Sequence, residues 1–390
     1  MKTIFLAYIK VSSFSGQTAS TVLIKDLLNA ENDIDFIDVY LYPLARKNPM
    51  VSFFKWLNLT WQTVKPLYKL FTSKVPILYI NVGQSYFSFF RILWWYIPFK
   101  LLRKKAKVVM SLNGYSFVHW RNADFKTYIF KNMLNSSDCV TVVGDLQREK
   151  LLEKGVLKGI LRSVPNTVDV QPNDKSFILE KLQKKEGEKI NILFLSLLVE
   201  KKGYPEYLEA LEILAGQNLK QPIEAILCGP ITKTMYCNRF KSISEADFWI
   251  DNKINQINRM SNSFSVKWIK GARDEYKKAL FDMADIFILP TFYPNEAQPL
   301  VLLEAMATGS AIITTNAGEI PSTLSTKSAI ILDHVSPENI SKAILKYLND
   351  PQLMVKNALE SYLLFQEKFS LQIYKDNWIR IFSSLSDKRP

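Results

Sequence analysis

The sequence predicts an α/β protein with two domains, each built on a parallel sheet that carries helices on both faces. Short apolar segments rich in β-branched residues alternate with helical patterns, which is typical of parallel sheets. The 390 residues are enough for two domains of ordinary size. A polar, charged run at 172–188 separates two such alternating series. We therefore expect a first domain at 1–171, a second at 172–370 and a terminal helix within 371–390.

The first domain is expected to contain six strands, at residues 3–9, 36–40, 76–82, 107–112, 139–143 and 161–164. The first strand leads through Gly16 into a helix, and ligands of open α/β sheets bind at such strand ends. Asn113 follows the fourth strand; its amide can hydrogen-bond a hydroxyl but cannot transfer a proton near neutral pH. His119, six residues further on, could supply that proton, although a histidine between valine and tryptophan is more often simply packed.

The positive charge of the chain is concentrated in the first domain. Residues 39–123 contain no Asp or Glu but thirteen Lys and Arg, which equals the whole net charge of +13. Twenty aromatic residues share the interval, and helices are expected at 51–71 and 86–102 with a basic cluster at 103–107. A basic and aromatic surface of this kind could bind an anionic membrane or nucleic acid. Alternatively, the aromatic side chains simply fill the core of the domain. We favour an anionic membrane and expect no nucleic-acid partner.

Other features of the composition indicate a cytoplasmic protein. The three cysteines are odd in number and lack metal-ligand spacing, as in a reducing compartment. With two histidines, a His-rich metal centre is excluded. No convincing signal peptide is found, and no stretch reaches the roughly 18 apolar residues of a membrane span. The expected location is the cytoplasm, peripheral on the inner face of the plasma membrane.

The second domain begins with a strand at 190–195 and a loop that ends in Lys202 and Gly203. A lysine and a glycine between a strand and a helix are typical of a diphosphate-binding loop. Further strands are expected at 225–229, 264–269, 286–289, 311–315 and 329–332. Helices are expected at 337–348, 351–368 and 372–385.

Two glutamates flank the start of another predicted helix in this domain. Glu296 lies in the loop before the helix, which we expect to begin at Pro299, and Glu304 follows after seven intervening residues. The N–H groups of residues 297–300 would favour a phosphate at the helix N-terminus. Glu296 could then accept sugar hydroxyls and Glu304 both ribose hydroxyls. An ordinary surface glutamate and a mid-helix glutamate would show the same spacing.

The surrounding run NEAQPLVLLEAMATGSAIITTNAGEIP closely resembles the E-x7-E donor-site motif of the family 4 retaining glycosyltransferases. These are two-Rossmann-domain enzymes with the GT-B fold, in which the last helix crosses back to the first domain. The resemblance implies two Rossmann-like domains that face each other across a cleft. It covers most of the chain, and it is strongest at 187–325.

The resemblance assigns a catalytic role to Glu296, and to Asn113 and His119 in the place where the family has a histidine facing the sugar. It implies donor-binding roles for further residues, which are Gly16, Lys202, Ile269, Lys270, Ala297, Gln298, Pro299, Leu300 and Glu304. This sequence departs from the family pattern at four positions. Asn113 replaces the histidine, Leu197 replaces an arginine of the diphosphate loop, and Ala297 and Glu319 replace glycines. Lys201 or Arg121 could supply the missing cation.

The function implied is transfer of a sugar, with retention, from a nucleoside-diphosphate sugar such as a UDP-sugar to a hydroxyl of a lipid-linked or oligosaccharide acceptor. The product would be a cell-surface polysaccharide such as capsule or lipopolysaccharide. No metal or cofactor is implied, because no Asp-x-Asp follows a strand to hold a metal. Two alternatives stay open: a catalytically impaired binding subunit of this fold, or a sugar-nucleotide epimerase.

Overall fold

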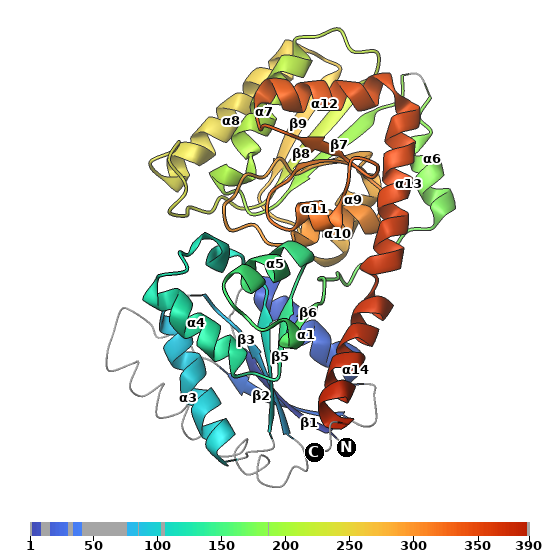
Figure 1. The fold of residues 1–390 in the computed structure, drawn as a ribbon. Coiled ribbons are helices and arrows are strands. Elements are labelled where there is room, and N and C mark those ends of the chain that lie inside the picture. The colour runs from blue at the N-terminus through green and yellow to red at the C-terminus, as the bar shows by residue number, and fades with distance from the viewer. Residues whose placement is uncertain are drawn as a thin grey trace. The chain divides into compact units, whose positions relative to one another are not determined.

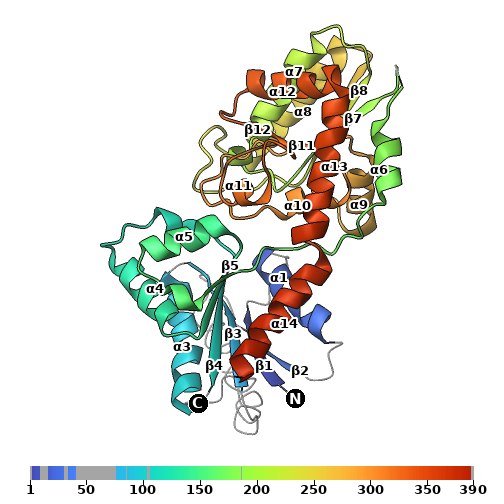
Figure 2. The same cartoon turned by 45° about the vertical axis from the view of Figure 1, so that its right-hand side comes forward.

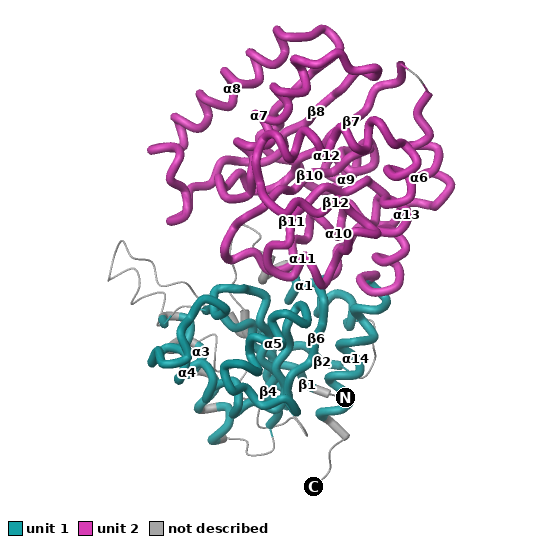
Figure 3. Tube along the Cα trace, turned by 45° about the horizontal axis from the view of Figure 1, so that its top comes forward, with its two compact units in different colours: residues 1–166, 371–390 teal, residues 167–370 magenta. Residues whose placement is uncertain are grey.

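The computed structural model describes residues 2–8, 16–29, 34–40, 76–84, 86–102, 106–185 and 187–387. The chain forms two compact units, one of residues 1–166 with 371–390 and one of residues 167–370 (Figures 1 and 3). The predicted helix at 51–71 and most of the basic cluster at 103–107 lie outside the described residues.

The first unit contains a six-stranded sheet in the order β2-β1-β3-β4-β5-β6, and all of its strand pairs are parallel. Its strands are β1 (Lys2–Tyr8), β2 (Ile34–Tyr40), β3 (Pro76–Asn81), β4 (Lys107–Leu112), β5 (Cys139–Val142) and β6 (Leu161–Ser163). Its described helices are α1 (Gly16–Leu28), α3 (Tyr86–Leu102), α4 (Phe125–Asn135), α5 (Asp145–Glu153) and α14 (Leu371–Asp387), with short 3-10 turns η1 (Ser116–His119) and η2 (Lys158–Ile160). The six predicted strands are confirmed, with small shifts at their ends.

Alternation along the strands divides the core of this unit between the two faces of the sheet. Successive side chains of a strand point to opposite faces. Phe5 accordingly packs with the aromatic residues of α3 and α4, whereas Ile4 and Leu6 pack with α1 and α14. Both faces of the sheet are therefore covered, which explains why its central strand β3 is almost entirely apolar.

Helix α14 completes one face of the first unit although it comes last in the chain (Figure 2). Tyr374, Trp378 and Phe382 are buried in the same cluster as Ile4 and Tyr79. The Trp378 and Tyr79 rings meet edge to face with centroids 5.4 Å apart. The predicted return of the last helix to the first domain is confirmed.

The second unit contains another six-stranded parallel sheet, in the order β12-β11-β10-β7-β8-β9. Its strands are β7 (Ile190–Leu195), β8 (Ile223–Cys228), β9 (Phe264–Ile269), β10 (Ile286–Ile288), β11 (Ala311–Thr315) and β12 (Ile330–Leu332). Its helices are α6 (Lys175–Leu182), the 3-10 turn η3 (Glu200–Lys202), α7 (Tyr204–Ala215), α8 (Ile243–Met260), α9 (Asp274–Met283), α10 (Leu300–Ala307), α11 (Ile320–Thr323), α12 (Pro337–Asn349) and α13 (Pro351–Lys368). The predicted strands and terminal helices are confirmed.

The polar run at 172–188, which we interpret from the sequence as the connection between the domains, contains helix α6. Ile178 and Leu182 lie four residues apart and so share one face of this helix. Both are buried in the core of the second unit. Their burial attaches the start of this segment firmly to the second unit.

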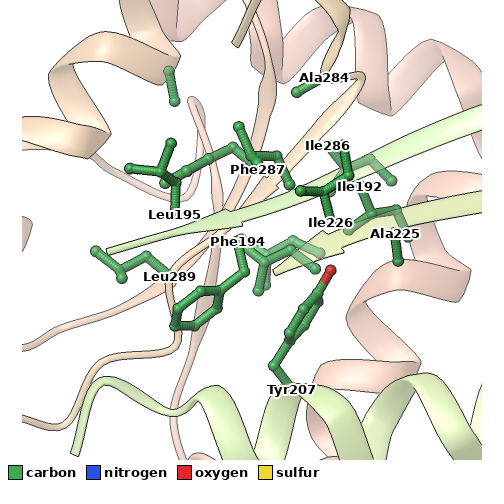
Figure 4. Close-up of a cluster of buried hydrophobic side chains, with 14 of the residues drawn as sticks. Ile192, Phe194, Leu195, Tyr207, Ala225, Ile226, Ala284, Ile286, Phe287 and Leu289 are labelled. Carbon is green, nitrogen blue, oxygen red and sulfur yellow. The ribbon is translucent and has the colours of Figure 1, made fainter. Parts of the chain in front are cut away.

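The core of the second unit is formed by apolar side chains on both faces of its sheet (Figure 4). Phe194 of β7 stacks on Tyr207 of α7 with ring centroids 5.3 Å apart. On the other face, Phe287 of β10 packs against Phe281 of α9 at 5.4 Å. These contacts fix the adjacent strands β7 and β10 between two layers of helices.

Strand β7 lies between β8 and β10, so the order of the strands reverses there. In open parallel sheets, ligands bind beyond the carboxyl ends of the strands at such a reversal. The loops that follow β7 and β10 contain Lys202 and Glu296. The topology therefore places both predicted residues at the expected binding edge.

Within the described part of the chain, no helix has the length and apolar character needed to cross a membrane.

Trp378→Ala should destabilise the first unit by about 3–5 kcal/mol, because it leaves a cavity beneath α14. Equilibrium urea unfolding followed by circular dichroism measures this change. Leu363→Ala, on the exposed side of α13, is the matched control and should change stability by less than about 0.5 kcal/mol. If Trp378→Ala lowers the free energy of unfolding no more than Leu363→Ala does, α14 contributes little to the stability of the first unit.

Candidate functional site

The core of the candidate site is an ion pair between two loops of the second unit. The Lys202 ammonium lies 3.1 Å from Oε2 and 3.3 Å from Oε1 of Glu296. Thr291, which is fully buried, donates a hydrogen bond of 2.9 Å to the same Oε2. Glu296 is 6% exposed, so its charge is compensated by a cation and a hydroxyl rather than by bulk water.

The Lys202 side is shaped by a tight turn. Lys202 ends the 3-10 turn η3, and Gly203 follows in a left-handed conformation with φ of 83°. A Cβ at Gly203 would lie 2.4 Å from the carbonyl oxygen of Pro290, so the close approach of the two loops requires glycine. The conformation brings Lys202 within reach of the loop after β10.

Glu200, at the start of the same turn, anchors a third loop. Its buried carboxylate accepts backbone N–H groups of Asn238, Arg239 and Phe240 at 2.6, 2.7 and 3.1 Å. Carboxylate bonds to backbone N–H groups are among the stronger hydrogen bonds in proteins. The segment at 231–242 is therefore held against the Lys202 loop.

The loop before Glu296 is held by aromatic and amide contacts. Asn295 donates to the Tyr236 hydroxyl at 3.0 Å, and the rings of Tyr236 and Tyr293 meet edge to face at 5.5 Å. The Glu296 N–H closes a turn onto the Tyr293 carbonyl at 3.0 Å. Burial raises the pKa of the Tyr293 hydroxyl, which therefore stays neutral.

Gly318 supports Glu296 from behind. Its φ is 56°, and a Cβ there would lie 2.0 Å from the Glu296 carbonyl oxygen. The next N–H, of Glu319, donates to the Ala297 carbonyl at 2.9 Å. Glu319, where the family has glycine, is itself fully buried. The turn after β11 thus fixes the backbone at Glu296 and Ala297.

Helix α10 begins one residue later than predicted. Pro299 is the N-cap, with an extended backbone (ψ of 119°), and the helix runs from Leu300. Because Pro299 has no N–H, only residues 297, 298 and 300 retain the backbone N–H groups that were predicted to favour a phosphate. Gln298 is buried and donates its side-chain amide to Thr323 at 2.9 Å.

Glu304 lies further along α10 and is 7% exposed. Its Oε1 accepts from the Lys277 ammonium at 2.5 Å, while Oε2 is buried and has no hydrogen-bond partner among the described residues. Burial raises the pKa of the Glu304 carboxyl, and Lys277 acts in the opposite direction. The two glutamates of the motif thus each face a lysine.

Two other predicted donor-site positions lie at the end of β9. The Ile269 carbonyl accepts the N–H of Gly229 at 2.8 Å, across the ends of β9 and β8. Lys270 is exposed, pairs with Asp247 of α8 at 2.7 Å and lies over the Trp268 ring. In this structure, Lys270 is therefore directed toward α8.

The cation expected from the family pattern at position 197 is absent, since Leu197 is 55% exposed and apolar. Lys201, one of the two suggested substitutes, lies over the Phe292 ring with its ammonium 4.7 Å from the centroid. Phe292 belongs to the loop after β10, so Lys201 is near the edge of the site.

Three predicted residues belong to the first unit. Gly16 is the first residue of α1. Asn113 directly follows β4; its Oδ1 lies 3.4 Å from the Ser111 hydroxyl, and its Nδ2 is buried with no hydrogen-bond partner among the described residues. His119 ends the turn η1, is exposed, and contacts the Tyr115 ring. Their roles in a reaction stay predictions.

Sequence reasoning missed Thr291 and Lys277. Thr291 carries a weak signal, because it follows the strand end and precedes Glu296 by five residues. Nothing in the sequence around Lys277 marks it as a site residue, because its partner Glu304 is 27 residues away on another helix. Among the described residues, no group of three or more His, Cys, Asp or Glu side chains is placed to hold a metal ion.

The second half of the chain matches a known family. Residues 174–361 match the model for "Glycosyl transferases group 1". A relative from Klebsiella pneumoniae, "Uncharacterized 41.2 kDa protein in cps region", is 24% identical over 238 residues. The match covers 58% of this chain and 57% of the relative, so this chain spans little more than half of that protein.

Solved structures of similar fold cover nearly the whole chain. Sucrose-phosphate synthase from Thermosynechococcus elongatus matches with a TM-score of 0.66 and 15% identity, covering 100% of both chains. Anabaena Alr3699/HepE in complex with UDP has a TM-score of 0.66 and 13% identity, covering 98% of this chain and 100% of that one. A glycosyltransferase from Rickettsia africae ESF-5 has a TM-score of 0.65 and 16% identity, covering 99% of each. The predicted fold class, two Rossmann-like domains of the GT-B type, is confirmed.

Gly318→Ala should destabilise the protein by about 2–4 kcal/mol, because the new Cβ both strains the backbone and meets the Glu296 carbonyl. Gly187→Ala is the matched control, since Gly187 also has a positive φ but nothing within 4 Å of the added Cβ. The control should cost only about 1 kcal/mol of strain. Urea unfolding midpoints compare the two variants, and equal midpoints would contradict a tight contact behind Glu296.

Proposed function

We propose that this chain, whose residues 174–361 match the model for group 1 glycosyltransferases, transfers a sugar from a nucleoside-diphosphate sugar to a hydroxyl of a growing polysaccharide. The observation that carries this proposal is the pairing of Lys202 with Glu296 at the edge where β7 and β10 end. A cation suited to a diphosphate and an acceptor suited to sugar hydroxyls meet there. The cps-region relative supports a polysaccharide product.

The donor would occupy the site in three parts. Lys202 and the first N–H groups of α10 bind the diphosphate. Glu296 accepts hydrogen bonds from hydroxyls of the sugar, and Glu304 accepts the ribose hydroxyls. One neighbour of similar fold was solved with UDP, which supports a nucleoside diphosphate as the ligand class.

Donor binding would exchange partners within the Lys202–Glu296 pair. The diphosphate competes for the Lys202 ammonium, and the sugar hydroxyls replace it at Glu296. Thr291 continues to hold Oε2 and thereby keeps the carboxylate oriented. The two side chains are only 18% and 8% exposed, so losing one partner without gaining another would be costly for either charge.

Catalysis would then consist mainly of stabilising the departing diphosphate. The bond between the anomeric carbon and the diphosphate oxygen breaks, and the acceptor oxygen bonds to the same face of that carbon. The acceptor proton passes to the leaving diphosphate. This course gives retention and uses no protein nucleophile, metal or cofactor. We also propose catalytic roles for Asn113, as a hydrogen-bonding group, and for His119.

The acceptor is proposed to be a lipid-linked glycan, with the first unit on the inner face of the plasma membrane and the protein in the cytoplasm. Helices α3 and α4 of that unit carry large exposed apolar side chains, which are Ile97, Leu101, Phe125 and Tyr128. On α4, the Lys131 ammonium lies 6.0 Å from the centroid of the Tyr128 ring, and the Lys126 ammonium lies over the Trp120 ring. Aromatic rings next to lysines suit an anionic lipid interface.

A catalytically impaired binding subunit is the second candidate. The observation that favours it is the exposed Leu197 in place of an arginine of the diphosphate loop. Slow hydrolysis of any nucleotide-sugar in a panel would reject the impaired subunit and identify the donor. Binding of a nucleotide-sugar without hydrolysis or transfer would favour it.

Glu296→Gln should lower turnover by at least about 100-fold, because the neutral amide no longer balances Lys202 or accepts sugar hydroxyls as a carboxylate. Release of nucleoside diphosphate from the donor identified in the panel measures turnover. Glu149→Gln, at an exposed position on α5, is the control and should retain full activity. Full activity of Glu296→Gln would refute the site.

The protein should sediment with vesicles containing phosphatidylglycerol at low salt, and less at high salt, because salt screens the lysine contacts. Replacing Phe125 and Tyr128 together by alanine should weaken vesicle binding by about tenfold, because two apolar side chains leave the interface. Phe248→Ala on α8, an equally exposed aromatic in the second unit, is the control. If vesicle binding is unchanged by salt and by the replacement of Phe125 and Tyr128, the membrane proposal is contradicted.

A further inference from the structure

Lys277 has no role in the function proposed above, yet it makes a close contact inside the candidate site. It lies in the first half of α9, and its ammonium is 2.5 Å from Oε1 of Glu304 on α10. The two side chains differ in solvent access: 27% of the Lys277 side chain is exposed, but 9% of Glu304. The pair therefore joins a partly solvated cation to a nearly dry carboxylate.

A buried carboxylate is costly to keep charged unless a cation or hydrogen bonds compensate it. Burial is the largest influence on the pKa of Glu304 and raises it. The Lys277 ammonium lowers the pKa through both its charge and its hydrogen bond. Lys277 is thus the group that opposes protonation of Glu304.

Protonation matters because it changes what Glu304 can bind. An ionised carboxylate only accepts hydrogen bonds, whereas the protonated acid carries a donor on one oxygen. Two neighbouring hydroxyls that both donate therefore require the ionised form. Glu304 has a free acceptor for such a ligand, because its Oε2 is buried without a hydrogen-bond partner among the described residues.

Lys277 also fixes the direction of the carboxylate. Its contact to Oε1 restrains rotation about the last torsion of Glu304 and leaves Oε2 available to accept other hydrogen bonds. The lysine itself is restrained by packing, with its ammonium 5.9 Å from the centroid of the Phe281 ring. Phe281 is buried in the core between α9 and β10.

We propose that Lys277 is a positioning residue for ribose recognition, which holds the Glu304 carboxylate ionised and oriented so that it accepts the 2′ and 3′ hydroxyls of the donor. This inference rests on the proposed function, because it assumes that Glu304 meets the ribose. It adds a residue that no family motif contributed to the site.

The thiol of Cys228 is also near Lys277 and does not disturb this arrangement. Cys228 ends β8, and burial raises the pKa of its thiol to about 11 despite the opposing effect of Lys277. The thiol therefore stays neutral at any working pH. Within the described residues, Lys277 is the only ionisable side chain recorded in contact with Glu304.

The test is nucleotide binding by the full chain, measured by titration calorimetry. UDP, ADP and GDP are compared first, and the tightest of them is then compared with its 2′-deoxy counterpart. Lys277→Met should weaken the ribonucleotide by at least about tenfold at the low end of the pH range, because one charge-assisted contact is lost and Glu304 is more readily protonated. The same substitution should change binding of the 2′-deoxynucleotide much less.

Three further variants separate positioning from a general structural effect. Lys278→Met is the matched control, since the neighbouring Lys278 pairs with Asp282 and not with Glu304. It should leave affinity within about twofold, a free-energy change too small to reflect a lost charged contact. Lys277→Arg keeps the cation and should restore most of the affinity. In a Glu304→Gln background, Lys277→Met should cause no further loss, because its effect passes through Glu304.

The pH dependence supplies an independent readout. Removing the ammonium raises the pKa of Glu304 further, so affinity of Lys277→Met should recover as the pH rises and Glu304 ionises. The native protein should reach its plateau at a lower pH. Circular dichroism confirms that each variant is folded.

The outcomes separate failure of the proposed donor site from failure of the role proposed for Lys277. If the native chain binds none of the nucleotides, the proposed donor site is wrong and this inference falls with it. If the native chain binds but Lys277→Met keeps the same preference for ribose and the same pH profile, only the inference falls. An equal loss for both nucleotides that persists in the Glu304→Gln background would make Lys277 a direct ligand and would also overturn the positioning role.

Discussion

The pairing of β7 with β10 is the constraint on which the candidate site depends. The two strands are neighbours in the sheet, although the residues that follow them, Lys202 and Glu296, are 94 positions apart. Parallel strands end at the same edge, so their loops meet. Every other contact of the site adds to this one: Thr291 orients Glu296, Gly203 allows the close approach, and Gly318 supports the backbone behind it.

The sequence predicts the strands and the motif residues well because their signals are local. Apolar runs such as 190–195 and 311–315 identify strands that are buried on both faces. The lysine–glycine loop and the two glutamates stand out by their spacing. Proline at 299 marks the start of α10 to within one residue, since proline suits both the N-cap and the first turn.

Side-chain contacts between segments that are distant in the sequence could not be predicted from the sequence. Lys277 and Lys278 are adjacent and chemically alike, and they differ by about 100° around the helix. Only the packing of α9 decides that the first meets Glu304 and the second meets Asp282. The burial of Ile178 and Leu182 was likewise hidden in a run whose composition is otherwise polar. In each case, the deciding partner lies on another element.

The order in which the chain is made gives the placement of α14 a biosynthetic consequence. The first unit is discontinuous: residues 1–166 emerge from the ribosome well before Leu371–Asp387. Until then, the sheet face that Trp378 and Phe382 will cover exposes Ile4, Tyr79 and their neighbours. The second unit is continuous and can close its core first. The nascent chain thus passes through a stage with one completed unit and one apolar sheet face open to chaperones.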